Sequence, residues 1–487
     1  MSAFMIQGCG SDVGKSLLVA GLCRLFTNRG KVVRPFKPQN MSNNAAVTAD
    51  GGEIGRAQAL QALACRTPPT VDMNPVLLKP QSDVGAQLIV RGVRIGNFEA
   101  KAHLADKREL LNIAVESYRR LERECDLMIV EGAGSPAETN LRATDMANMG
   151  FAHAVGLPVF LVGDIERGHV IASLVGAHAV LDDADRALIH GFIINKFRGD
   201  ASLFDAGLKT ITDRTGWPSI GVVPYLHAAR QLPAEDAVQL DHEVARGRSA
   251  PAGKLRIVIP RFPHISNFDD FDPLRLEPDV ELMFIPPGRP LPRDTDLIIL
   301  PGTKATVADL HVLYSQGWDV DIRAHVRHGG RVLGICGGYQ MLGTAVNDPD
   351  RIEGSRASIA GLGLLDVETT MTQNKALASV SGVDIKTGAT VHGYEMHIGV
   401  TTGGGTDRPM IRLQDGRHEG AISPDGLISG CHIHGLFNDT AFRAMWISKL
   451  GARSANIDYS TSVETALDEI AAILSQSLDL AAFRVGA

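Results

Sequence analysis

Two short segments of this 487-residue chain carry residues whose types and spacing could do chemistry. Residues 8–16, GCGSDVGKS, have the pattern of a phosphate-binding loop. Residues 334–340, GICGGYQ, have the pattern of a sharp turn between a strand and a helix that exposes a cysteine. The chain therefore offers a candidate nucleotide site and, far downstream, a candidate nucleophile.

The phosphate-binding pattern lies between an expected strand at residues 4–7 and an expected helix at residues 17–27. Backbone N–H groups of such a loop, together with the helix N-terminus, form an anion site. We expect Lys15 to neutralise the β- and γ-phosphates of ATP and the Ser16 hydroxyl to ligate Mg²⁺. The spacing departs from the common form, because five residues rather than four separate the two flanking glycines. The expected nucleotide-binding residues are Gly8, Ser11, Asp12, Val13, Gly14, Lys15, Ser16 and Lys37.

A magnesium ion beside these phosphates needs further oxygen ligands, which carboxylates commonly supply. Glu131 ends an apolar run, and ligand groups in open α/β sheets lie at the carboxyl ends of strands. We therefore expect Ser16, Glu131 and Asp50 to hold the metal, with Glu53 as the alternative to Asp50. Lys37 follows another apolar run and is expected to face the transferring phosphoryl group. The alternatives are a solvated Glu131 and an ordinary surface Lys37.

The cysteine pattern predicts a nucleophile at Cys336, since glycines on both sides permit a strained turn. A helix N-terminus and a neighbouring histidine favour the reactive thiolate form of such a residue. His434 is the best candidate for the base, and His432 is the alternative because it would share the same strand face. The backbone groups expected to stabilise an oxyanion are those of Gly302, Thr303 and Gly337. The other five cysteines are interpreted as small hydrophobic residues.

A nucleotide site and a cysteine–histidine site in one chain suggest two coupled reactions. The simplest pairing is hydrolysis of glutamine to ammonia, followed by ATP-driven attachment of that ammonia to a carboxylate.

Composition is that of a globular protein, with 44% hydrophobic and 21% charged residues. A net charge of −7 gives no sign of a nucleic-acid or anionic-membrane partner. The sequence begins without a basic, apolar leader, and no apolar run is long enough to span a bilayer. Six scattered cysteines show no CxxC pair, which favours a reducing cytoplasm.

Both halves of the chain alternate short apolar runs with longer amphipathic stretches, which predicts an α/β fold with mostly parallel sheets. The periodicity is lost at residues 244–254, VARGRSAPAGK, and we interpret this segment as a linker. The expected domains are therefore residues 1–243 and 255–487. Residues 462–480 have the pattern of a closing amphipathic helix.

With both sites in place, the sequence resembles the cobyric acid synthase family over nearly its full length. Beyond the two signatures, the resemblance rests on KPQNMS at 37–42, DGGEIGRAQALQA at 50–62, MNPVLLKP at 73–80, VEGAGSPAE at 130–138, LPGTK at 300–304, GYEMH at 393–397 and HGLF at 434–437. The segments at 50–62 and 73–80 are the most diagnostic, because generic phosphate-loop proteins lack them.

The resemblance implies an N-terminal domain similar to dethiobiotin synthetase and a C-terminal class I glutamine amidotransferase domain. It implies ATP and Mg²⁺ as cofactors, with L-glutamine and a corrinoid as substrates. The corrinoid reaction is amidation of adenosylcobyrinic acid a,c-diamide at its b, d, e and g carboxylates, giving adenosylcobyric acid in cobalamin biosynthesis. Gln340 matches the position that holds the glutamine substrate in this class.

The sequence departs from the expected pattern at the third position of the catalytic site and at two further positions. Class I domains commonly place a glutamate two residues after the catalytic histidine, where this chain has Leu436. The resemblance therefore implies a cysteine–histidine dyad, with Glu395 as a candidate replacement for the orienting group. His432 and Cys9 stand where the family more often has tyrosine and threonine.

Three other functions compete with this interpretation. The nearest is the sister enzyme that makes the a,c-diamide from cobyrinic acid. A rival of another class is a phosphate-loop partitioning or scaffold ATPase with a degenerate amidotransferase domain. The third is amidation of some other polycarboxylate. Candidate contacts for substrate carboxylates are Arg56, Lys79 and Arg91, each weighed against an ordinary surface charge.

Overall fold

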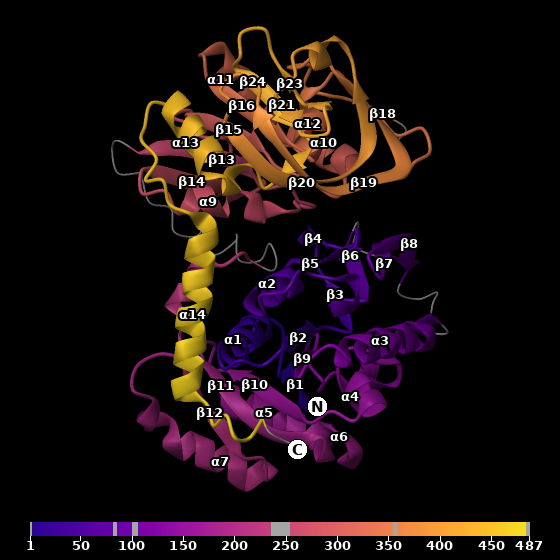
Figure 1. Cartoon of the computed structure of the whole chain (residues 1–487), viewed down its shortest axis with the longest axis vertical. Coiled ribbons are helices and arrows are strands. Elements are labelled where there is room, and N and C mark those ends of the chain that lie inside the picture. Colours follow the sequence, from indigo (N-terminus) through magenta and orange to yellow (C-terminus); the bar gives the residue numbers. More distant parts are fainter. Residues whose placement is uncertain (1, 81–84, 100–105, 235–253, 354–357, 484–487) are drawn as a thin grey trace. The chain divides into compact units, whose positions relative to one another are not determined.

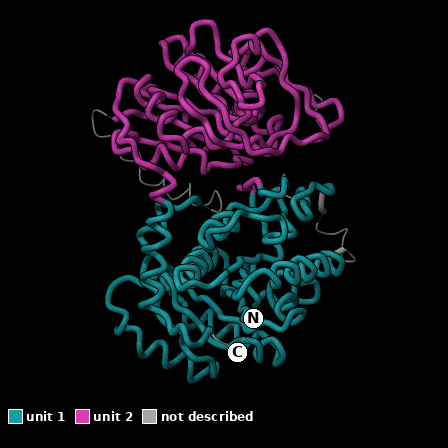
Figure 2. Tube along the Cα trace, viewed as in Figure 1, with its two compact units in different colours: residues 1–42, 48–235, 463–487 teal, residues 43–47, 236–462 magenta. Residues whose placement is uncertain are grey.

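The computed structural model describes residues 2–80, 85–99, 106–234, 254–353 and 358–483. Contacts between residues divide the chain into two compact units (Figure 2). The first unit consists of Met1–Ser42, Thr48–Glu235 and Val463–Ala487, and the second of Asn43–Val47 and Asp236–Ser462. The predicted α/β class, with a parallel sheet in each half, is confirmed.

The first unit is built on a six-stranded parallel sheet in the order β12-β11-β10-β1-β9-β2 (Figure 1). Its strands are β1 (Ser2–Gly8), β2 (Val33–Phe36), β9 (Leu127–Glu131), β10 (Val159–Asp164), β11 (Ile189–Phe197) and β12 (Ser219–Pro224). The middle strands are continuous apolar runs because helices cover both faces of such a sheet. The helices are α1 (Lys15–Asn28), α2 (Arg56–Ala64), α3 (Asp106–Glu122), α4 (Met149–Val155), α5 (Val170–Val180), α6 (Asp183–Ala187) and α7 (Asp205–Thr215).

A smaller sheet, in the order β3-β6-β7-β8, is formed by the part of the chain between β2 and α3. Its strands are β3 (Gln39–Met41), β6 (Val76–Pro80), β7 (Gly85–Val90) and β8 (Val93–Glu99). The short strand β5 (Glu53–Gly55) also belongs to the first unit, whereas β4 (Ala45–Val47) belongs to the second. The same part of the chain, between β2 and α3, contains the segments at 50–62 and 73–80 that generic phosphate-loop proteins lack.

The C-terminal helix α14 (Tyr459–Ser477) confirms the predicted amphipathic helix. Its residues from Val463 onward belong to the first unit, although the predicted boundary gave the whole C-terminal part to the second domain. Two contacts explain this: the Phe483 ring stacks on Phe4 with centroids 4.7 Å apart, and Arg24 pairs with Glu464 at 2.6 Å. Both rings and the Arg24 side chain are buried. The predicted linker lies outside the described residues except for Lys254.

The second unit has a six-stranded sheet in the order β14-β13-β15-β16-β24-β23, parallel except for β23. Its strands are β13 (Leu255–Pro260), β14 (Val280–Ile285), β15 (Leu297–Leu300), β16 (Arg331–Ile335), β23 (Ala421–Ile422) and β24 (Ile428–Cys431). The helices are α9 (Asp272–Arg275), α10 (Thr306–Ser315), α11 (Trp318–Arg327), α12 (Gly337–Leu342) and α13 (Thr440–Lys449).

A second, mainly antiparallel sheet of this unit runs β18-β17-β19-β20-β25, with β21 and β22 at its side. Its strands are β17 (Ala345–Asn347), β18 (Ser358–Ala360), β19 (Glu368–Asp384), β20 (Thr390–Thr402), β21 (Ile411–Leu413), β22 (His418–Glu419) and β25 (Ile433–His434). In the pairing of β20 with β25, Tyr394 lies opposite His434, so the GYEMH segment at 393–397 is next to the candidate base. Within the described residues, no helix has both the length and the apolar character needed to cross a bilayer.

Candidate active sites

The phosphate-binding pattern forms the expected strand–loop–helix, with β1 ending at Gly8 and α1 beginning at Lys15. Gly14 adopts φ 93°, a left-handed conformation that favours glycine. Two side chains from the end of β11 hold the loop: Asn195 Nδ2 donates to the Val13 carbonyl at 2.8 Å, and Lys196 Nζ donates to the Asp12 carbonyl. Sequence reasoning missed both, because they lie in a distant strand.

Lys15 connects two loops at the carboxyl edge of the sheet. Its Nζ donates to the carbonyl of Gly10 at 2.9 Å and to the carbonyl of Gly134 at 3.1 Å. Gly10 belongs to the loop after β1, and Gly134 to the loop after β9. The ammonium is therefore held at the place where a loop of this kind binds phosphates.

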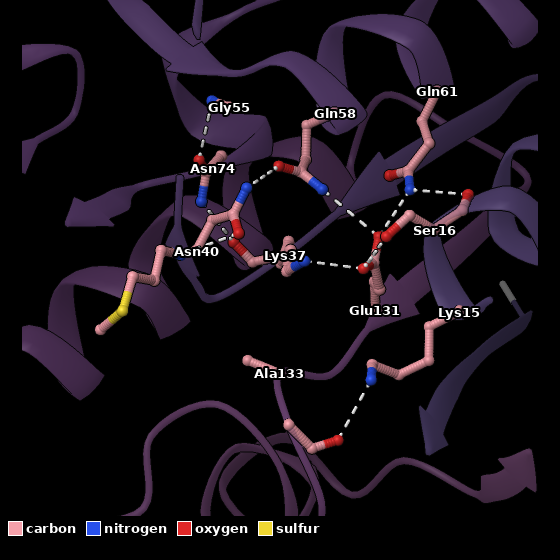
Figure 3. Close-up of polar contacts among 12 residues, drawn as sticks. Lys15, Ser16, Lys37, Asn40, Gly55, Gln58, Gln61, Asn74, Glu131 and Ala133 are labelled. Atoms are coloured by element: carbon pink, nitrogen blue, oxygen red, sulfur yellow. Dashed lines mark hydrogen bonds and ion pairs between the residues drawn. The ribbon is translucent and has the colours of Figure 1, made fainter. Parts of the chain in front are cut away.

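Glu131 is the centre of a buried polar cluster (Figure 3). Its Oε1 accepts hydrogen bonds from Ser16 Oγ at 2.6 Å and from Lys37 Nζ at 2.7 Å. Its Oε2 accepts hydrogen bonds from Gln61 Nε2 at 2.6 Å and Gln58 Nε2 at 3.3 Å. The side chain of Glu131 is fully buried, so these donors compensate a charge that water does not reach.

The cluster brings together three residues predicted from the sequence and two that were missed. Ser16, Lys37 and Glu131 were predicted, whereas Gln58 and Gln61 were not. The signal for the glutamines was present, since both lie in the diagnostic segment at 50–62 and follow each other by three residues on α2. Residues three apart on a helix share a face.

The donor set fits a magnesium ion. The Ser16 hydroxyl and the Glu131 carboxylate are hard oxygen ligands, and Mg²⁺ bound with a nucleotide takes few protein ligands besides phosphate oxygens and water. Asp50 is not part of this set. Its exposed carboxylate accepts a hydrogen bond from the Val71 N–H at 3.2 Å, and it has no hydrogen bond or ion pair to Ser16 or Glu131. Asp50 as a metal ligand stays a prediction without support from a contact.

The alternative carboxylate, Glu53, forms a fully buried ion pair with Lys79. Lys79 was a candidate for binding substrate carboxylates, but this pairing already uses its charge. Arg91, another such candidate, pairs with Glu116 on α3. Both cations are thus engaged inside the first unit.

Cys336 occupies the turn between β16 and α12 and has φ 52°, an unfavourable value for a residue with a side chain. Strain of this kind persists where the surrounding packing imposes it, often at functional sites. The packing here is tight: a methyl group on Gly338 would lie 2.0 Å from the carbonyl oxygen of Leu300. The thiol is largely buried and lies 3.6 Å from the Met396 carbonyl oxygen.

His434 is oriented by a buried carboxylate, Asp270. Its Nδ1 lies 2.7 Å from Asp270 Oδ2, and the other oxygen, Oδ1, accepts the Gly435 N–H at 2.7 Å. The Tyr394 ring stacks on the imidazole with centroids 5.2 Å apart. Burial alone would lower the pKa of His434, but Asp270 and Cys336 act against it and raise that pKa to about 10.

Asp270 corrects the expectation for the third residue of this site. Glu395, the candidate replacement for the missing glutamate, instead accepts hydrogen bonds from Arg417 at 2.9 and 3.1 Å and has none with His434. Asp270 lies 164 residues before His434 in sequence, in the short 3₁₀ helix Phe268–Phe271 that follows β13. That separation explains why a search near the histidine missed it.

The predicted oxyanion groups come together around the two catalytic candidates. A methyl group on Gly302 would lie 2.8 Å from His434 Cε1, and one on Gly337 would lie 3.2 Å from the Thr303 nitrogen. Gly337 is the first residue of α12, so its N–H has no partner inside the helix. Gln340 is buried one turn further along, where Nε2 donates to the Ile398 carbonyl at 3.0 Å.

His432, the alternative base, has other partners. Its Nδ1 lies 2.9 Å from Glu419 Oε1, its Nε2 lies 3.2 Å from Thr401 Oγ1, and its ring stacks on His397 with centroids 4.0 Å apart. Burial and the neighbouring His432 lower the pKa of His397 to about 3, which keeps it neutral. These contacts favour His434 as the base.

The remaining cysteines match their interpretation as small hydrophobic residues. None of the six forms a disulfide. Burial raises the pKa of Cys9 to about 12, that of Cys125 to about 11, and that of Cys23 and Cys431 well above the usual value. A thiol held protonated is a poor nucleophile.

Comparison with known proteins assigns both halves of the chain. Residues 4–239 match a family described as the CobQ/CobB/MinD/ParA nucleotide binding domain, and residues 256–442 match the CobB/CobQ-like glutamine amidotransferase domain. A cobyric acid synthase of Caulobacter sp. (strain K31) is 62% identical over 482 residues, which is 99% of this chain and 99% of that protein. The chain belongs to the cobyric acid synthase family.

Other cobyric acid synthases agree over nearly the full length. That of Methylorubrum populi is 57% identical over 98% of this chain and 97% of its own, and that of Bradyrhizobium sp. (strain ORS 278) is 56% identical over 98% and 96%. As a cobyric acid synthase family member, the chain is an amide-forming enzyme of cobalamin biosynthesis with its own glutamine amidotransferase domain. The partitioning-ATPase alternative is therefore wrong.

Proposed function

We propose that the chain amidates the b, d, e and g carboxylates of adenosylcobyrinic acid a,c-diamide, giving adenosylcobyric acid. Each amidation consumes one glutamine and one ATP. The observation that carries this proposal is the 62% identity to a cobyric acid synthase over 99% of both chains. Two buried sites of the required chemistry support it.

In the second unit, the Cys336 thiolate attacks the side-chain amide carbon of glutamine. Backbone N–H groups around Thr303 and Gly337 stabilise the oxyanion that forms. The His434 imidazolium gives its proton to the leaving nitrogen, so that ammonia departs and a thioester remains. His434 then takes a proton from water, which attacks the thioester and releases glutamate. Asp270 holds the imidazole in the required orientation throughout, as the buried aspartate does in serine proteases.

In the first unit, an oxygen of the substrate carboxylate attacks the γ-phosphorus of ATP and ADP leaves. The resulting acyl phosphate makes the carbon electrophilic, because phosphate is a far better leaving group than oxide. Ammonia then attacks that carbon, and phosphate departs with the carbon–oxygen bond electrons. Lys15 and Lys37 stabilise the charge of the transferring phosphoryl group.

We further propose that the chain uses Mg²⁺ with ATP, held by the Ser16 hydroxyl and the Glu131 carboxylate. When bound, the ion neutralises charge on the β- and γ-phosphates. Hydrogen bonds from Lys37, Gln58 and Gln61 hold the Glu131 carboxylate in position. A cytoplasmic location is also proposed, since six free cysteines suit a reducing compartment.

The test is mass spectrometry of cobyrinic acid a,c-diamide incubated with the protein, Mg·ATP and glutamine. Four successive replacements of OH by NH₂ are expected. No change on the diamide, together with two replacements on unamidated cobyrinic acid, would contradict the proposal in favour of the sister activity. No replacement on either compound, with glutaminase and ATPase activity intact, would contradict the choice of substrate.

A further inference from the structure

A cavity in the first unit lies next to the proposed phosphoryl-transfer site. Its walls come from Gln39 after β2, Lys107 of α3, and several residues between 133 and 148, which follow β9. In the main sheet β9 lies between β1, which leads into the phosphate-binding loop, and β2. The cavity is thus one strand away from that loop, at the carboxyl edge where α/β sheets bind ligands.

One loop separates the cavity from the Lys15 side chain. Ala133 and Ser135 line the cavity, and the carbonyl of Gly134 between them accepts the hydrogen bond from Lys15 Nζ (Figure 3). Asn148 fixes this loop, because its Oδ1 accepts the Ala133 N–H at 3.1 Å and its Nδ2 donates to the Ala133 carbonyl. A group bound in the cavity would therefore lie at a fixed distance from phosphates bound by Lys15.

The size of the cavity limits what it can hold. Its volume is about 140 Å³. A pocket that encloses a whole drug-sized molecule has roughly 300–1,000 Å³. The cavity therefore admits one side arm of a large substrate and excludes a macrocycle.

The charges of the lining suit a carboxylate or an amide. Lys107 Nζ donates to Thr144 Oγ1 at 3.1 Å and has no ion pair among the described residues. Two other charged residues of the lining already have partners. Arg142 donates to both carboxylate oxygens of Asp185, and the Asp145 carboxylate accepts hydrogen bonds from three backbone N–H groups. The Thr144 hydroxyl donates in turn to the Leu141 carbonyl at 3.3 Å, so the Lys107 ammonium, which has three N–H donors, is the group that binds a carboxylate or carbonyl oxygen. The last charged lining residue, Glu138, is exposed, where water and salt screen its charge.

We propose that this cavity binds one non-reacting side arm of the polycarboxylate acceptor, whose carboxylate or amide tip contacts Lys107 and Thr144. The proposal rests on the proposed function, because it takes the acceptor to carry several similar arms. Amidating several carboxylates at one phosphoryl site requires the acceptor to rebind in a new orientation each time. An anchored arm fixes which carboxylate reaches the phosphate, so the cavity sets the order of amidation.

The test compares the wild-type protein with Lys107→Gln, Lys107→Arg and Arg108→Gln in steady-state kinetics with cobyrinic acid a,c-diamide. Arg108 is the matched control, an exposed cation next in sequence and outside the lining. Loss of a charge-assisted hydrogen bond in Lys107→Gln should raise KM for the diamide by about tenfold or more. Lys107→Arg should recover most of that loss, and Arg108→Gln should resemble the wild type. KM for ATP and the glutaminase kcat should not change, and Lys107→Gln should release mixed isomers at partial conversion.

An unchanged KM for the diamide in Lys107→Gln, with an active wild type, would overturn the cavity assignment and leave the proposed function standing. An equal rise in KM for ATP would also overturn it, since that result indicates damage to the nucleotide site. A wild-type protein that does not amidate the diamide would instead overturn the proposed function.

Discussion

At the scale of single residues, each site is organised around one buried carboxylate. Glu131 is compensated by Lys37 and neutral donors, and Asp270 by His434 and a backbone N–H. A buried charge without such partners is costly, so each carboxylate fixes the position of the groups around it. The proposed nucleophile, Cys336, and the proposed phosphate-binding residue, Lys15, are the ones a sequence pattern identifies. The residues that hold them in place come from other parts of the chain.

The substitution Asp270→Asn tests the orienting role of this carboxylate. The amide keeps the size of the side chain but removes the charge that stabilises the imidazolium of His434. We expect the glutaminase kcat to fall by about 10³-fold, within the range found for buried aspartates of this kind. Amidation supported by added ammonia should be retained, which separates loss of catalysis from loss of folding. Glutaminase activity near the wild-type level would show that His434 needs no orienting partner.

The raised pKa of His434 predicts a pH dependence of stability. The pKa of His434 is 6.5, the ordinary value, in the unfolded chain and about 10 in the folded protein. The interactions of the protonated imidazole therefore stabilise the folded protein fully below about pH 6.5. That stabilisation is lost as the pH rises toward 10. The thermal unfolding temperature should therefore fall between pH 7 and pH 10, and fall less in Asp270→Asn, where the partner charge is absent. Parallel curves for the two proteins in scanning calorimetry would contradict this linkage.

The substitution Glu131→Gln tests the centre of the nucleotide site. It keeps the shape of the side chain but removes the negative charge that faces Lys37 and that we propose binds Mg²⁺. We expect ATP-dependent amidation to fall by about 10²-fold or more, whereas the glutaminase activity of the second unit should remain. The matched control is Asp50→Asn, which changes an exposed carboxylate outside the cluster and should stay active. Inactivity of the control with activity of Glu131→Gln would reverse the metal-ligand assignment.

At the scale of elements, the strands and helices next to each motif could be predicted, because they combine apolar runs with loop chemistry. The expected strand at residues 4–7 is part of β1, and the expected closing helix is α14. The partners of these elements could not be predicted. Periodicity shows that α14 has an apolar face but does not show which surface covers it. That surface is α1, the helix that opens with Lys15.

The close contact between α1 and α14 can be tested at Gly21. A Cβ atom there would lie 2.5 Å from Leu474 Cδ1 and 2.6 Å from Ile470 Cγ2. Gly21→Leu should therefore overpack this contact and lower the free energy of unfolding by about 1–3 kcal/mol. The matched control is Gly176→Leu in α5, where a Cβ atom would have no neighbour within 4 Å. This substitution should raise the free energy of unfolding by up to about 1 kcal/mol, because leucine has a higher helix propensity than glycine. Equal effects in chemical denaturation would contradict the packing described.

The third residue of the glutaminase site shows the limit of sequence reasoning most clearly. The class pattern places an acid two residues after the histidine, and Leu436 excludes that solution. Glu395 was the nearest acid in a recognised segment, yet it binds Arg417. β13 pairs with β15, and the segments that follow these two strands lie side by side, with the Ser266 N–H donating to the Gly302 carbonyl at 2.9 Å. Asp270 lies in the first of these segments, and Gly302 in the second packs against His434. Such a neighbourhood is set by sheet order, which local patterns do not encode.

At the scale of the whole molecule, the chain combines a glutamine amidotransferase domain, which we propose releases ammonia, with a nucleotide-binding domain, which we propose activates a carboxylate. Family membership over the full length assigns both to one enzyme. Ammonia in neutral water is mostly protonated and then unreactive, so production and use by one chain avoid that loss. We propose that the nitrogen of each new amide is the ammonia that Cys336 releases from glutamine and is not taken from free ammonium in solution.

The most direct measurement is isotopic. The corrinoid diamide is incubated with Mg·ATP, glutamine labelled with ¹⁵N in its side-chain amide, and excess unlabelled ammonium, and the product is analysed by mass spectrometry. The wild-type protein should incorporate mainly ¹⁵N, whereas Cys336→Ala should form the same amides with unlabelled nitrogen alone. Incorporation of ¹⁵N by Cys336→Ala would contradict the account, because glutamine would then be hydrolysed without the proposed nucleophile.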